Sequence, residues 1–334
     1  MKSYLSSLNM TLMELLSEDR RVFLLGEDIA DPYGGAFRVT AGLSTAFPDR
    51  VIQTPISEAG IVGVAAGMAM RGLRPVVEIM FGDFITLAAD QIINHAAKFH
   101  EMYAGQVNVP IVIRTPMGGG RGYGPTHSQS LEKMLLGMPG LSVVAPSHFH
   151  DAGMLLRRAV LHSDAPVVFI EHKGLYGQDL FLENKADIKY ELMGESLFTT
   201  TVLRNFDERR EAPDIAILSY GGMSRLVQEV LESMADEEIW IVAIMPSLLS
   251  ESPLTGIESL FSSCCAVFVI EEGAGKYGWG AEITASLSET LGVNCPRIVR
   301  ISSQPTVVPA AREMEREMLP SMEEVKRSIL EVLK

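Results

Sequence analysis

The sequence predicts an α/β protein with two domains. Short runs rich in Val, Ile and Leu alternate with stretches of helical spacing, which is typical of parallel strands covered by helices on both faces. The chain has 334 residues, 47% of them apolar, which is enough for two cores of ordinary size. A polar, charged stretch near the middle interrupts the alternation and separates the two parts.

The first predicted domain covers residues 1–180. It opens with an amphipathic helix, "YLSSLNMTLMELLSEDRR", and strands are expected at "RVFLLGED", "RPVVEIMF", "VPIVIRTP", "LSVVAP" and "PVVFIEH". Helices are expected at "AADQIINHAAKFHEMYAG" and "HDAGMLLRRAVLHSD". Several of the strand-like runs lack strict alternation, so we expect a parallel sheet buried between helices.

Residues 181–212 are interpreted as a connecting segment that holds a short hairpin, and residues 213–334 as a smaller α/β domain. Its strands are expected at "DIAILSYG", "IWIVAIMP", "CAVFVIEE" and "PRIVRIS". Its helices are expected at "SRLVQEVLESMADE" and from about Ala281.

Charge and composition narrow the possible partners. The formal net charge is −14, which disfavours nucleic acid and anionic membrane surfaces as main partners. The N-terminus lacks the features of a secretory signal, and no uncharged apolar stretch has membrane-spanning length. The three cysteines, Cys264, Cys265 and Cys295, lack metal-binding spacing and are expected to be reduced, so we expect a cytoplasmic protein.

One glycine motif resembles a dinucleotide-binding fingerprint. Gly273, Gly275 and Gly278 follow a predicted strand and precede a predicted helix in the order G-x-G-x-x-G. The acid that should follow about twenty residues later, to hold a ribose, is missing from "LGVNCPRIVRIS". We therefore favour a tight strand-to-helix turn and keep a nicotinamide-dependent oxidoreductase as an alternative.

A second glycine-rich segment, "MGGGRGYGPTHSQS", ends near His127. Glycines let a backbone approach a ligand closely, and a histidine beside such a loop is a candidate acid, base or hydrogen-bond donor. Pro125 and the absence of a following Gly-Lys-Ser/Thr argue against a phosphate-binding loop. A flexible turn with a surface histidine is the alternative.

Glu58 is a single carboxylate at the start of an apolar, small-residue helix, "GIVGVAAGMAM". Gly63 and Gly67 lie four residues apart on this helix, so another helix can approach it closely. That contact could lie within the chain or at a subunit interface near a site.

Taken together, the motifs "LLGEDIADPYGGAFRVTAGL", "TPISEAGIVGVAAGMAMRGLRPVVEI", "DQIINHAAK", "VPIVIRTPMGGG", "THSQS" and "GLSVVAPS" resemble a known family. It is the beta subunit of the thiamine-diphosphate-dependent 2-oxoacid dehydrogenases, in the transketolase-like superfamily. The later "DIAILSYGG" and "VIEEGAGKYGWGAEI" resemble the C-terminal domain of the same family. The resemblance implies a pyrimidine-binding N-terminal domain.

The resemblance also implies roles for particular residues. Glu58 would share a proton with a ring nitrogen of the cofactor's aminopyrimidine, and Phe84 would stack on that ring. His127 would orient the 2-oxo substrate and assist acyl transfer to a lipoyl group. Glu27 would belong to a polar passage between paired active sites, with a solvated or capping acid as the alternative.

Further implied components are metals and partner chains. Some relatives hold potassium near the positions of Ile111, Ala159, Val160 and Asp164. The chain has no Gly-Asp-Gly motif, which in this enzyme class holds magnesium and the cofactor's diphosphate. An alpha subunit would therefore supply that half of the site in an α2β2 heterotetramer, and a lipoyl-bearing acyltransferase would accept the acyl group.

The expected activity is that of an oxidoreductase: decarboxylation of a small 2-oxoacid with reductive acylation of a lipoyl domain. One alternative is another thiamine-dependent enzyme, such as acetoin dehydrogenase or a ketol-forming carboligase or lyase. A second alternative is a non-catalytic assembly subunit, against which the joint presence of Glu58, Phe84 and His127 argues.

Overall fold

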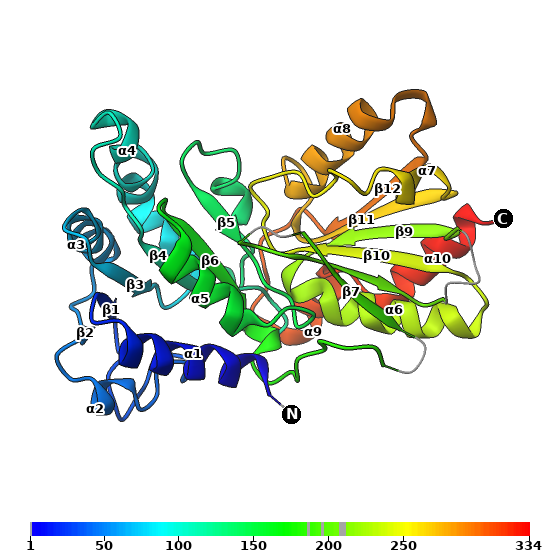
Figure 1. The fold of residues 1–334 in the computed structure, drawn as a ribbon. Helices are drawn as coiled ribbons and strands as arrows, with labels where there is room; N and C mark the ends of the chain where they lie inside the picture. The colour runs from blue at the N-terminus through cyan, green and yellow to red at the C-terminus, as the bar shows by residue number, and fades with distance from the viewer. Residues whose placement is uncertain (1, 186–187, 195–196, 207–211) are drawn as a thin grey trace.

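The computed structural model describes residues 2–185, 188–194, 197–206 and 212–334. Two α/β domains lie side by side, each built on a six-stranded sheet with helices on both faces (Figure 1). The predicted fold class is confirmed.

The first sheet is parallel throughout, as the apolar strand sequences predicted. Its strands follow the order β2-β1-β3-β4-β6-β5. They are β1 (Val22–Gly26), β2 (Val51–Gln53), β3 (Arg74–Glu78), β4 (Val112–Met117), β5 (Ser142–Val144) and β6 (Val167–His172).

Helices cover both faces of this sheet. Neighbouring strand residues such as Val112 and Ile113 belong to two different core clusters, because successive side chains point to opposite faces. Helices α1 (Tyr4–Glu18) and α5 (Ala152–His162) pack on one face, and α3 (Glu58–Met70) packs on the other.

Shorter helical segments complete the first domain: α2 (Leu43–Ala46), a 3₁₀ segment (Gly82–Ala88), a π-helical turn (Gln91–Ala96) and α4 (Phe99–Met102). The stretch "AADQIINHAAKFHEMYAG", predicted as one helix, is therefore broken into a π-helical turn and a short α-helix.

The second sheet is mixed and follows the order β12-β11-β9-β10-β8-β7. Four strands are parallel: β9 (Ile215–Ser219), β10 (Ile241–Pro246), β11 (Ala266–Ala274) and β12 (Arg297–Ser303). The hairpin of β7 (Lys189–Met193) and β8 (Thr200–Arg204) joins the edge of the sheet antiparallel to β10. Part of the predicted connecting segment, 181–212, thus contributes two strands to the second sheet, and its residues 186–187, 195–196 and 207–211 lie outside the described residues.

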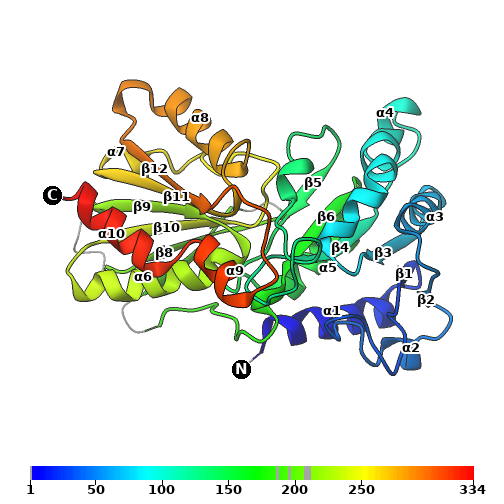
Figure 2. The same ribbon diagram turned by 180° about the vertical axis from the view of Figure 1, so that it is seen from behind.

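Helices α6 (Ser224–Asp236) and α10 (Met322–Val332) pack on one face of the second sheet. Helices α7 (Ser259–Ser262) and α8 (Trp279–Leu291) pack on the other. Figure 2 shows the short helix α9 (Arg312–Met318) where the two domains meet.

The domains share a continuous core rather than a loose contact. One apolar cluster includes Ile113 of β4 and Val269 of β11, which belong to different sheets. Backbone hydrogen bonds also cross the boundary, from Ala145 to the Ser247 carbonyl at 2.7 Å and from Leu249 to the Val143 carbonyl at 2.8 Å. Across the described ranges, no helix is long and apolar enough to cross a membrane.

Candidate active site

The predicted site residues share one edge of the first sheet. Glu27 directly follows β1, Glu58 lies just after β2, Phe84 after β3 and His127 after β4. These four strands are neighbours and run parallel, so their carboxyl ends meet at the same edge. Ligands of open α/β sheets bind at this edge, so the placement fits a binding site.

Glu58 is the first residue of α3, and only 6% of it is exposed. Ser57 caps the helix by accepting a hydrogen bond from the Gly60 N–H at 3.3 Å. Within the described part of the chain, nothing hydrogen-bonds to the Glu58 carboxylate. The helix N-terminus favours its negative charge, and its oxygens remain available to a ligand.

Glu27 lies near enough to Glu58 for the charge of Glu58 to affect its pKa. Its side chain is buried and accepts a hydrogen bond from the Ser57 backbone, while its Oε1 has no partner among the described residues. Burial raises the pKa of Glu27, and the nearby charge of Glu58 raises it further. Burial contradicts the solvated form of the alternative for Glu27, whereas its hydrogen bond from the backbone of Ser57, the N-cap of α3, fits the capping form.

Aromatic rings surround His127. Its ring lies 4.7 Å from the ring of Phe81 and 5.2 Å from the ring of Phe84, edge to face in both cases. Tyr123 contacts Phe81 from the same loop at 6.2 Å between centroids. Because His127 and Phe84 are only half-buried, both rings keep an accessible side.

Lys173, at the end of β6, was missed by sequence reasoning. It is fully buried, and its ammonium donates to the backbone carbonyl of His127 at 2.9 Å. The ammonium also lies 5.6 Å from the centre of the Phe81 ring, within range of a cation–π contact. Burial lowers the pKa of Lys173 to about 8. The sequence carried a usable signal, since Lys173 directly follows the predicted strand "PVVFIEH" at the edge where ligands bind.

The glycine motif at Gly273, Gly275 and Gly278 is a turn between β11 and α8, as favoured from the sequence. The carboxylate of Glu271 accepts a hydrogen bond from the Gly280 N–H at 3.2 Å, at the start of the helix. A Cβ on Gly278 would lie 2.4 Å from that carboxylate. The position that a nucleotide phosphate would need is thus filled by the chain itself.

Comparison with known proteins agrees with this fold. Residues 1–178 match the model "Transketolase, pyrimidine binding domain", and residues 205–325 match "Transketolase, C-terminal domain". A pyruvate dehydrogenase E1 component subunit beta-1 of Arabidopsis thaliana is 36% identical over 326 residues, which cover 96% of this chain and 86% of the relative. A 2-oxoisovalerate dehydrogenase subunit beta of Bacillus subtilis is 33% identical and covers 99% of this chain and 98% of the relative.

The chain belongs to the family of 2-oxoacid dehydrogenase E1 beta subunits. An acetoin:2,6-dichlorophenolindophenol oxidoreductase subunit beta of Cupriavidus necator is 32% identical over 98% of this chain and 96% of the relative. A solved structure titled as a split-gene transketolase, inactive beta4 tetramer, superimposes with a TM-score of 0.72 at 20% identity. The superposition covers 99% of this chain and 98% of the solved chain, and at this identity the likeness supports the fold alone.

The residues that the family resemblance assigned to potassium lie at the opposite, amino-terminal side of the first sheet. Ile111, Ala159 and Val160 are buried, and the Ile111 carbonyl already accepts a hydrogen bond from the Val167 N–H at 2.9 Å. Asp164 pairs with Arg74 at 3.5 Å. Across the described residues, no group of three or more His, Cys, Asp or Glu side chains could hold a metal ion.

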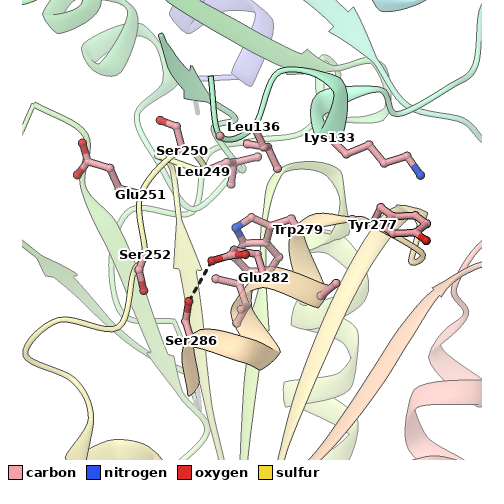
Figure 3. Close-up of a pocket in the computed structure, with 14 residues that line it drawn as sticks. Lys133, Leu136, Leu249, Ser250, Glu251, Ser252, Tyr277, Trp279, Glu282 and Ser286 are labelled. Atoms are coloured by element: carbon pink, nitrogen blue, oxygen red, sulfur yellow. Dashed lines mark hydrogen bonds between the residues drawn. The ribbon is translucent and has the colours of Figure 1, made fainter. Parts of the chain in front are cut away.

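A pocket of about 490 Å³ lies away from the predicted site of this beta subunit, between the two domains. Figure 3 shows Lys133 and Leu136 of the first domain facing Tyr277 and Trp279 of the second. The pocket contains none of the predicted site residues.

Proposed function

We propose that this chain is the beta half of a thiamine-diphosphate-dependent 2-oxoacid dehydrogenase E1 component. With an alpha subunit, it would decarboxylate a small 2-oxoacid and reductively acylate a lipoyl domain. The observation that carries this proposal is Glu58, a buried carboxylate without a hydrogen-bond partner in the described chain, at a helix start on the ligand-binding edge of the sheet. Membership of the E1 beta family supports the same activity.

The residues present fit the aminopyrimidine half of thiamine diphosphate. Glu58 offers an open carboxylate that can hold a proton at a ring nitrogen, and the half-buried ring of Phe84 offers a stacking surface. Glu27 has an unpartnered oxygen and a raised pKa, so it can hold a proton close to Glu58. When bound, the cofactor supplies the electron sink that decarboxylation requires.

His127 is assigned to the substrate side of the site. Its ring is held edge-on between Phe81 and Phe84, so its orientation is restricted while one side stays open. A histidine in this position can donate a hydrogen bond to the 2-oxo group and later assist transfer of the acyl group. The surrounding rings would limit access of water.

The diphosphate and magnesium are assigned to an alpha subunit, since the sequence lacks Gly-Asp-Gly. Large apolar side chains are exposed beside Glu58: Ile56 just before α3, Val64 on α3 and Leu87 on the adjoining 3₁₀ segment. Exposed apolar surface of this kind is typical of a subunit interface. We propose that this surface is covered in an α2β2 heterotetramer, with a lipoyl-bearing acyltransferase as the acceptor.

Two finer assignments follow from the same family. Potassium near Ile111 and Asp164 remains a proposal that metal analysis of the purified complex would test. The three cysteines are free thiols, which supports the proposal of a reducing, cytoplasmic setting.

A second candidate function is thiamine-dependent cleavage of acetoin. The observation that favours it is the 32% identity to the acetoin-oxidising beta subunit over nearly the full length of both chains. The two candidates share the cofactor half-site and differ in the substrate, so a substrate panel distinguishes them.

The deciding experiment is calorimetric titration of thiamine diphosphate with magnesium into the chain alone and into the chain co-expressed with an alpha subunit. We expect binding only to the pair. The pair is then assayed with pyruvate, branched 2-oxoacids and acetoin. Tight binding to the isolated chain would contradict the split site, and no binding to the pair would favour a non-catalytic assembly subunit.

A further inference from the structure

The loop that carries His127, residues 118–130, has little structure of its own. Two backbone hydrogen bonds within it are long: 3.4 Å from Gly118 to the Gln129 carbonyl and 3.3 Å from His127 to the Gly124 carbonyl. Four of its glycines have positive φ, with 95° at Gly118, 85° at Gly120, 74° at Gly122 and 80° at Gly124. Glycines lose the most conformational entropy on ordering, so external contacts are needed to hold the loop in one shape.

Those contacts come from the second domain, through two buried carboxylates. Glu272 on β11 accepts hydrogen bonds from the Gly119 N–H at 2.8 Å and the Ser130 hydroxyl at 2.9 Å. Glu315 on α9 accepts a hydrogen bond from the Gly122 N–H at 2.6 Å. Hydrogen bonds to ionised acceptors are roughly twice as strong as neutral ones, so these two side chains restrain both the base and the middle of the loop.

Two basic side chains of the first domain, His172 and Lys173, complete the arrangement. The second oxygen of Glu272 lies 2.7 Å from His172 Nε2. Burial opposes the charge of Glu272, but the attraction of His172 and the hydrogen bonds to the carboxylate outweigh it and lower its pKa to about 2. Lys173 holds the His127 carbonyl, and the charges of Glu272 and Glu315 favour its protonated form. The loop is therefore held between carboxylates of one domain and basic side chains of the other.

The fit around the loop is close. A Cβ on Gly118 would lie 2.0 Å from His172 Nε2, and a Cβ on Gly119 would lie 3.1 Å from Glu315 Oε1. Side chains at these positions would push the loop away from the residues that hold it. The glycines are needed here for close approach to the restraining groups, in addition to their backbone conformation.

We infer that the C-terminal domain positions the catalytic loop, with Glu272 and Glu315 as positioning residues that act on His127 through the backbone of residues 118–130. This inference rests on the proposed function, since it takes His127 to act on the substrate. It assigns to the second domain an indirect part in the chemistry at the edge of the first sheet, through the position of the loop.

The test uses the co-expressed alpha–beta complex and compares Glu315→Ala, Glu315→Gln and Glu313→Ala. Glu313 lies on the same helix but is exposed, so it is the matched control. Hydrogen exchange of residues 118–130 is measured together with kcat, KM and the Kd of thiamine diphosphate. For Glu315→Ala we expect exchange at least about tenfold faster in the loop only, and kcat lower by about 10- to 100-fold, because small misplacements of a catalytic group are costly.

The other readouts separate positioning from a general loss of structure. The Kd of the cofactor should stay within about twofold, because Glu315 binds the loop at Gly122 and neither Glu58 nor Phe84 belongs to that loop. Glu315→Gln, which keeps an acceptor, should recover part of both effects, and Glu313→Ala should match the wild type. Glu272→Gln provides an independent second variant. Glu272 uses both of its oxygens, one for the Gly119 N–H and the Ser130 hydroxyl and the other for His172, so an amide at this position removes one of these contacts and should loosen the loop at Gly119.

Unchanged loop exchange in both Glu315→Ala and Glu272→Gln would overturn the inference, as would a loss of kcat that only follows the loss of cofactor binding. Hydrogen exchange reads the loop without any substrate. A wild-type complex that fails to decarboxylate 2-oxoacids would therefore overturn the proposed function, while the exchange data would still decide whether the C-terminal domain holds the loop.

Discussion

Two strand-to-helix turns in this chain both place a glutamate at a helix start, and they use it differently. At the turn from β11 to α8, the Glu271 carboxylate accepts a hydrogen bond from the Gly280 N–H. At the turn from β2 to α3, Glu58 is itself the first helical residue, and Ser57 provides the cap. The Glu271 carboxylate is occupied by a hydrogen bond within its own turn. Among the described residues, the Glu58 carboxylate has no hydrogen-bond partner, so it is available to a ligand.

The difference between the two turns shows that the G-x-G-x-x-G pattern of residues 273–278 indicates close packing in this chain. The pattern gives no support for nucleotide binding. Gly278 is needed because a larger residue would collide with the Glu271 carboxylate, which already fills the helix N-terminus. The turn without a glycine fingerprint, at Glu58, is the one that leaves a buried acid accessible to a ligand. The predictions below test this difference.

The largest expected effect is on catalysis. Glu58→Gln in the alpha–beta complex should lower kcat by about 10²- to 10⁴-fold, because the side chain can no longer exchange a proton with the bound cofactor. The matched variant Glu271→Gln should keep kcat within a few-fold of the wild type. Steady-state decarboxylation assays check both, and comparable losses in the two variants would remove the distinction between the turns.

The next effect is on the pH dependence of stability. Burial raises the pKa of Glu271 to about 7, well above the value expected in the unfolded chain. Between about pH 4.5 and pH 7 the folded chain holds a proton that the unfolded chain releases. The free energy of unfolding should therefore fall as pH rises through this window, by up to about 3 kcal/mol from this group.

Glu271→Gln should flatten this dependence, so that the variant is more stable than the wild type at pH 8 and close to it at pH 4.5. Urea unfolding at several pH values measures the effect. Parallel curves for the two proteins would show that Glu271 does not titrate in this range.

A smaller effect is expected at Gly278. Gly278→Ala should destabilise the chain by about 1 to 3 kcal/mol, because the new Cβ forces the Glu271 carboxylate or the start of α8 to move. A thermal melt gives the shift in Tm, and the double variant Gly278→Ala with Glu271→Ala should recover part of the loss. A neutral Gly278→Ala would mean that the turn is looser than the structure indicates.

The smallest effect distinguishes packing within the chain from a subunit interface at α3. A Cβ on Gly67 would meet nothing within 4 Å, so Gly67→Ala should stabilise the isolated chain by about 0.5 to 1 kcal/mol through helix propensity. If a partner chain covers this face, as proposed, the same change should weaken assembly with the alpha subunit. Sedimentation of the complex checks the second part, and unimpaired assembly would place the interface elsewhere.

Much of the fold was predictable because buried parallel strands and amphipathic helices have strong local patterns. Five of the six strands of the first sheet and the helices α1, α5 and α6 lie where those patterns predicted them, whereas the short strand β2 was missed. The hairpin of β7 and β8 was expected, but its membership of the second sheet was not, since its pairing with β10 depends on residues about 40 positions away. The break between the π-helical turn and α4 was also missed, because tertiary packing overrides helix propensity there.

By itself, the sequence determined the two-domain α/β class, the family and the residues Glu58, Phe84 and His127 at the carboxyl ends of their strands. These follow from local patterns and ordered motifs along the chain. Only the tertiary structure decided which groups act together. It brings Glu27 near Glu58 and places the ammonium of Lys173 in a hydrogen bond with the His127 carbonyl. It also places the Glu272 and Glu315 carboxylates where they accept hydrogen bonds from the loop backbone. Glu272 and Glu315 lie more than 140 residues from the loop backbone they bind, so no pattern of neighbouring residues could reveal these contacts.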